Sequence, residues 1–200
     1  MLDKGRGSVN SEIRPPGRPS GRFLVSGTHT PETQRHLLEC KKETFDPTMV
    51  RIDLRLKFDN SSPLRPELDG DVTGDGMLRG IEVFSFYKDW IKAGHRLAAG
   101  ETRDETIPVA STSEFTYRLS FSRRDDRVVV RLFQGPRSTR GVARLLAETE
   151  DTFGDFLQNC CYLPLSHLEG MKLLNASISD TSAFVEIRDL VHDLRRLVGD

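Results

Sequence analysis

The residues best suited to chemistry lie in one short loop that begins at Asp71. Oxygen-bearing side chains stand at alternate positions in this loop, in the order Asp71, Thr73 and Asp75, and Gly76 follows them. A calcium ion takes about six to eight oxygen ligands, so side chains that converge from alternate positions of a tight turn suit a hard cation. Gly76 stands where such a turn needs a residue free to adopt positive φ. The pattern therefore predicts a calcium site.

Two further residues complete the expected ligand set. Met77 offers its backbone carbonyl, and Glu82 is placed to close the site with both carboxylate oxygens. An apolar, helix-like run from Val83 to Leu97 follows at once. Residues 71–82 resemble the calcium-binding loops of EF-hand and dockerin proteins, and the resemblance covers this loop and no other part of the chain. It implies a calcium-binding domain with calcium as its cofactor.

A second interpretation of this region needs no metal. Residues 59–80 are rich in Asp and Gly, which accumulate in turns because they tolerate positive φ or bond to their own backbone. Residues 59–80 are then a polar connection between two β-elements.

Candidate catalytic groups do not form a recognisable set. The five histidines, at positions 29, 36, 95, 167 and 192, do not show the spacing of a metal-binding helix. The adjacent Cys160 and Cys161 would need His167 or His192 beside them to act as nucleophiles, and nothing in the sequence brings them together. The phosphate-loop, dinucleotide-binding and nucleophile-elbow motifs are missing from the sequence. We predict no catalytic residue and no cofactor other than calcium.

Composition restricts the classes of partner. The 200 residues are 36% hydrophobic and 30% charged, with a formal net charge of −1. This near-zero charge argues against nucleic acid as a partner. No apolar run reaches the roughly 20 residues that a membrane span needs, and no secretory signal is recognisable. The three cysteines do not form a disulfide framework. We therefore expect a cytoplasmic protein that is not bound to a membrane.

Patterning divides the chain into three parts. Residues 1–22 are rich in Gly and Pro, with five basic and two acidic side chains, and are expected to form a disordered basic tail. Residues 23–48 are expected to be a partly ordered extension, and residues 49–200 a single α+β domain.

Hydrophobic periodicity predicts the elements of this domain. Strict alternation predicts a strand from Val50 to Phe58, and residues 115–132 show the clearest hairpin of the chain. Helical spacing predicts helices over residues 87–97, from Ser138 or Thr139 to Cys161 with a break at Pro164, and over 182–198.

The element order predicts an α+β fold, with a small antiparallel sheet and two or three helices packed on one face. This layout is similar to that of small bacterial immunity and accessory proteins, which bind a partner and catalyse nothing. Several charged residues are expected on the exposed face of the sheet, as either a solvated surface or a polar binding surface: Arg51, Asp53, Arg55, Lys57, Arg118 and Arg131. The first hypothesis is a non-catalytic protein-interaction module whose partner is another protein, the second is a calcium-binding domain, and the third is an enzyme of unknown class.

Overall fold

The computed structural model describes residues 23–58, 72–73, 77–137 and 142–199. The expected tail, residues 1–22, lies outside the described residues. Within the described part, two antiparallel sheets and four α-helices give the α+β class that the sequence predicts. No helix in this part is long and apolar enough to cross a membrane.

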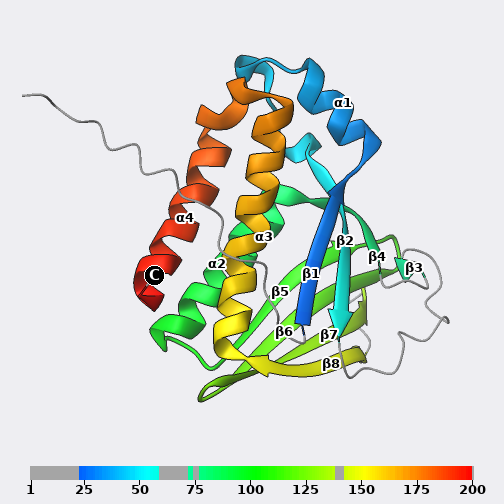
Figure 1. Ribbon diagram of the computed structural model, residues 1–200. Coiled ribbons are helices and arrows are strands. Elements are labelled where there is room, and N and C mark those ends of the chain that lie inside the picture. The colour runs from blue at the N-terminus through cyan, green and yellow to red at the C-terminus, as the bar shows by residue number, and fades with distance from the viewer. Residues whose placement is uncertain (1–22, 59–71, 74–76, 138–141, 200) are drawn as a thin grey trace, which may run out of the picture.

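The first sheet has the strand order β1-β2-β4-β3 (Figure 1). Its central strand, β2 (Arg51–Phe58), follows the predicted alternation and buries every second residue. Strand β1 (Phe23–His29) pairs along one side of β2, and β4 (Met77–Glu82) pairs along the other side. The two-residue strand β3 (Val72–Thr73) pairs with the beginning of β4.

The second sheet is a meander, with strand order β5-β6-β7-β8. The predicted hairpin is confirmed as β6 (Phe115–Arg124) and β7 (Arg127–Pro136). Strand β5 (Asp104–Ser111) forms one edge and β8 (Arg144–Thr152) forms the other. The described residues therefore form two antiparallel sheets instead of the single sheet predicted from the sequence.

The helices gather on one side of the sheets (Figure 1). Helix α2 (Val83–Ala99) includes the helix predicted over residues 87–97, and Gly100 caps its end with a φ of 72°. It packs against α3 (Phe153–Leu174) and α4 (Ser182–Val198), while the short α1 (Pro31–Glu39) packs against α3. Three 3₁₀ turns connect these elements: η1 (Lys42–Thr44), η2 (Pro47–Met49) and η3 (Ala176–Asp180).

One hydrophobic core joins the two sheets and the helices. Its largest fully buried side chains include Trp90 and Tyr87 from α2 and Phe121 from β6. Phe23 and Leu37, from the segment expected to be an extension, belong to the same core. Residues 23–40 therefore pack as part of the domain.

Two local predictions were wrong. The helix predicted from Ser138 or Thr139 to Cys161 is wrong over residues 144–152, which form strand β8, and is confirmed only from Phe153, where α3 begins. In β8, Ala147, Thr149 and Asp151 face inward while Glu148 and Glu150 face outward. Pairing with β7 satisfies the backbone of this segment and overrides its helix-like spacing.

The second error concerns Pro164, which was expected to end a helix. Helix α3 instead continues through Pro164 to Leu174.

The charged residues that were expected on one sheet face lie in two different sheets. Arg51, Asp53, Arg55 and Lys57 lie on β2, whereas Arg118 and Arg131 lie in the second sheet.

We expect side-chain truncation on the buried and exposed faces of the β6–β7 hairpin to lower the stability of the protein by different amounts. Leu119 is fully buried and Arg118 is exposed, so Leu119→Ala should lower the free energy of unfolding by roughly 2–5 kcal/mol and Arg118→Ala by less than about 0.5 kcal/mol. Urea denaturation of the two variants measures the difference. Equal losses would contradict the face assignment.

Candidate functional site

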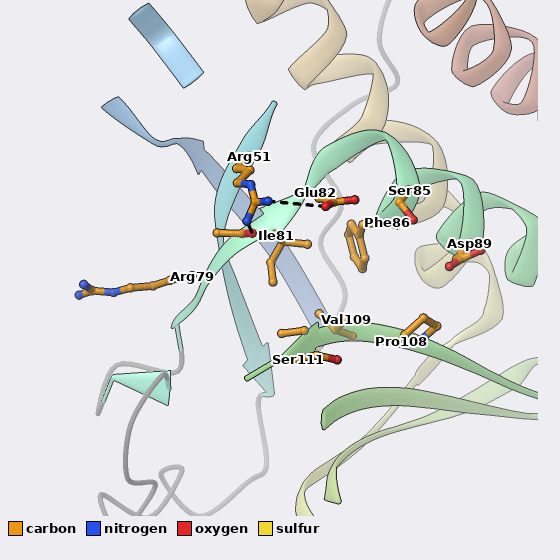
Figure 2. A pocket seen from close by; sticks show the side chains of 12 residues that line it. Arg51, Arg79, Ile81, Glu82, Ser85, Phe86, Asp89, Pro108, Val109 and Ser111 are labelled. Carbon is orange, nitrogen blue, oxygen red and sulfur yellow. Dashed lines mark hydrogen bonds and ion pairs between the residues drawn. The ribbon is translucent and has the colours of Figure 1, made fainter. Parts of the chain in front are cut away.

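A cleft of about 280 Å³ opens where the two sheets meet (Figure 2). We call it the inter-sheet cleft. One wall is β4 with Arg51 of β2, the opposite wall is the end of β5, and the first turns of α2 lie between them. It is lined by Arg51, Arg79, Gly80, Ile81, Glu82, Ser85, Phe86, Asp89, Pro108, Val109, Ala110 and Ser111.

The β4 wall is organised by a bulge at Gly80. The register of β4 against β2 shifts between Ile52 and Leu54, and Gly80 adopts φ 64°, a conformation that favours glycine. The amide of Gly80 donates to Asp53 Oδ1 at 3.1 Å, and its carbonyl accepts from Arg51 Nη1 at 3.4 Å. Side chains of β2 thus satisfy the backbone groups that the bulge releases.

The β5 wall carries a proline in an edge strand. The amide of Arg123 donates to the carbonyl of Arg103, and Ile107 stands opposite Leu119 in the same register. Because ladder bonds alternate along a strand, the nitrogen of Pro108 points away from β6. Pro108 therefore removes a donor from the open edge of β5 and costs no bond within the sheet.

Three polar side chains follow one another along the cleft: Glu82 at the end of β4, and Ser85 and Asp89 on α2 (Figure 2). Glu82 Oε1 lies 3.6 Å from Arg51 Nη2, and both side chains are about half exposed. The hydrogen-bonded Glu105 raises the pKa of Arg96, and the charges of Glu101 and Asp89 make smaller contributions in the same direction.

Below these polar groups lies an apolar floor. Ile81, Phe86 and Val109 are each at least 94% buried, yet each contributes to the lining of the cleft. The cleft therefore combines an apolar base with a charged rim, an arrangement typical of a binding site.

A second group of polar side chains is enclosed between β1, α2 and α3. The Nε2 atom of His167 bonds to the carbonyl of Gly27 at 3.0 Å, so this nitrogen carries the proton because a carbonyl can only accept. The Nδ1 atom of neutral His167 then accepts from the hydroxyl of Tyr87. The ring of His29 lies 5.4 Å from that of His167, centre to centre.

Burial suppresses the ionisation of this group. Desolvation lowers the pKa of His167 to about 4, with a smaller contribution from the neighbouring His29, and desolvation also lowers the pKa of His29. Burial raises the pKa of the Tyr87 phenol well above its ordinary value. His29 and His167 are therefore neutral near pH 7.

The close fit around Gly27 indicates a structural role for His167. A Cβ atom at Gly27 would lie 2.7 Å from Cε1 of His167, so the imidazole ring packs directly on the strand backbone. His167 binds the carbonyl that this edge strand turns away from β2. Burial favours the neutral forms of both groups in the Tyr87–His167 pair.

The adjacent cysteines are also part of the packing. Cys160 is fully buried, and burial raises the pKa of its thiol well above the ordinary value. Its Sγ atom would lie 2.9 Å from a Cβ at Gly94, where α2 and α3 pack closely. Both cysteines are buried, as expected for small apolar residues.

The predicted calcium ligands fall partly within the described structure. Asp71 and Asp75 lie outside the described residues. Thr73 stands opposite Met77 in the β3–β4 pair, and Glu82 precedes α2 and faces Arg51. Among residues 23–58, 72–73, 77–137 and 142–199, the structure places no group of three or more His, Cys, Asp or Glu side chains that could hold a metal ion.

Sequence reasoning missed the inter-sheet cleft because its residues come from four elements between positions 51 and 111. The alternation in β2 marks Arg51 as solvent-facing, and Gly80 and Pro108 interrupt strand-like segments, which is a signal for bulges or edges.

Comparison with protein-family models, curated proteins and solved structures gives no match.

We expect His167 to make stability depend on pH. The pKa of His167 is about 4 in the folded protein and about 6.5 after unfolding. The contribution of neutral His167 to the free energy of unfolding is therefore fully present above pH 6.5 and is lost as the pH falls towards 4. Over this range the free energy of unfolding should fall by about 3 kcal/mol more in the natural protein than in His167→Gln.

Urea denaturation between pH 7 and pH 4 measures this difference. The matched control is His192→Gln, because His192 is exposed on α4 and its replacement should keep the natural pH dependence. Parallel curves for the natural protein and His167→Gln would contradict the buried, neutral state of His167.

Calcium provides a test of the loop hypothesis. A cation that binds only the folded protein stabilises it by about 2.7 kcal/mol at a hundred times its dissociation constant. Since Glu82 is paired with Arg51, we expect the thermal midpoint to be the same in millimolar calcium and in chelator. A rise of several degrees that disappears in Glu82→Gln would instead establish the calcium site.

Proposed function

We propose that this protein is a non-catalytic protein-interaction module whose partner is another protein. The observation that carries the proposal is the inter-sheet cleft, which offers an apolar floor and a charged rim. The layout of the chain is similar to that of small bacterial immunity and accessory proteins, and this fold-level analogy agrees with the proposal.

The placement of the reactive side chains supports the non-catalytic part. His167, Tyr87 and Cys160, which have the chemistry for acid–base or nucleophilic roles, are all at least largely buried. His167 and Tyr87 are bonded to each other, and Cys160 is packed between helices. Their contacts account for them as structural residues.

The uncovered face of the second sheet competes with the cleft as a binding surface. Its charges, however, are largely matched across the strands. Arg131 pairs with Glu148, and Arg127 Nε lies 3.2 Å from Glu150 Oε1. A partner that bound there would have to compete with these ion pairs, so the cleft is the better candidate.

Affinity capture tests the proposal. The full-length protein is immobilised and exposed to an extract of its source cells, with an excess of free protein as competitor. We expect one protein to be captured saturably and to re-form a complex of fixed stoichiometry from purified components, measured by light scattering. Failure to form any saturable complex, or turnover of the captured protein by this chain, would overturn the proposal.

A further inference from the structure

We propose that the inter-sheet cleft receives a basic side chain, Lys or Arg, from a segment of the partner protein. The aliphatic stem lies on the apolar floor and the charged head meets the carboxylate of Asp89. This inference rests on the proposed function, because it names the chemistry that the interaction module recognises.

The charges in the cleft favour a cationic occupant. The guanidinium of Arg51 donates to the Gly80 carbonyl and pairs with Glu82, so the charges of Arg51 and Glu82 compensate each other. Arg79 extends away from the cleft (Figure 2). Asp89 is then the carboxylate of the lining whose charge is least compensated from within the cleft.

The charge of Asp89 acts on Arg96, which is already engaged by another carboxylate. Arg96 lies two turns further along α2, and the charge of Asp89 makes a small contribution to the raised pKa of Arg96. It donates from Nε and Nη2 to both carboxylate oxygens of Glu105, at 2.7 and 2.6 Å. This bidentate pair fixes the guanidinium over β5, so Asp89 remains able to accept from an incoming group.

The shape of the cleft fits the same occupant. Lys and Arg bury their methylene stems along apolar surface while the charged head stays near water. Pro108, which is exposed, and Ala110, which is half-buried, provide accessible apolar surface above the buried Phe86, Ile81 and Val109. Asp89 lies at intermediate burial in the same lining. An acidic side chain would be repelled by Asp89, and a purely apolar one would leave the Asp89 carboxylate without a cation inside the cleft, since Glu82 is already paired with Arg51.

The occupant is a side chain of a protein segment rather than an added strand. Arg51 and Asp53 already bind the backbone of Gly80, and Pro108 removes a donor from β5. Each wall therefore has a break in the backbone groups that a continuous ladder would need, which favours recognition through side chains.

The test uses random peptides displayed on phage and selected on the full-length protein. We expect the enriched peptides to contain Lys or Arg, and replacement of that residue by norleucine to weaken binding at least tenfold. The Asp89→Asn variant should weaken the same peptides at least tenfold, measured by fluorescence anisotropy. Its matched control is Asp189→Asn, whose side chain is 66% exposed on α4 and which should change the dissociation constant less than twofold.

A steric variant gives an independent measurement. Ser85 is exposed at the cleft, so Ser85→Trp should fill it without disturbing the core and should abolish peptide binding. Ser26→Trp, at an exposed position on β1, is the control that should bind normally. Circular dichroism confirms that all four variants are folded before binding is compared.

The outcomes separate this inference from the proposed function. No enriched peptide, enriched peptides without a basic residue, or full binding to Asp89→Asn would overturn the inference. If arginine amide competes as well as the peptides do, the cleft is a site for small cations and the inference also fails. A captured partner that binds Ser85→Trp normally would overturn the inference and leave the proposed function intact.

Discussion

Strand β1 lies at the edge of its sheet, so the backbone groups that point away from β2 have no neighbouring strand to bind them. Side chains from other elements bind these groups instead. The register of β1 with β2 turns the peptide groups of Phe23 and Gly27 away from the sheet. Asp151 Oδ2 accepts from the Phe23 amide at 2.9 Å, Asn159 Nδ2 donates to the Phe23 carbonyl at 2.9 Å, and His167 binds Gly27. These contacts join β1 to β8 and α3, so the two sheets and the helices enclose one core. Unmet backbone groups in this buried place would be costly.

This constraint explains which parts of the fold the sequence could predict. The strand from Arg51 to Phe58 and the hairpin of β6 and β7 were confirmed, because alternation of buried and exposed residues is local information. Strand β8 was predicted as a helix because Leu145, Leu146 and Thr149 also fit helical spacing, and only pairing with β7 decides between the two. The division into two sheets depends on pairings between distant segments, which periodicity does not specify.

The candidate site was harder to predict than the fold for a related reason. The calcium pattern is contiguous and was visible in the sequence, but Glu82 of that pattern faces Arg51, more than thirty residues earlier in the chain. The inter-sheet cleft exists because β4 and β5 belong to different sheets and α2 lies between them. Asp89 is unremarkable in sequence, as one of several charged residues on an amphipathic helix. Its position beside the apolar floor follows from tertiary packing alone.

The open strand edges also determine what kind of recognition the cleft can support. An exposed edge invites pairing with another chain, and proteins prevent this with bulges, prolines and charges. Both walls of the cleft carry such devices, since Gly80 forms a bulge bound by Arg51 and Asp53, and Pro108 interrupts β5. Arg51, which binds the carbonyl of the Gly80 bulge, also belongs to the charged rim of the cleft through its pair with Glu82. In the proposed interaction, a partner would meet a charge pattern to which a residue of the protected edge, Arg51, contributes.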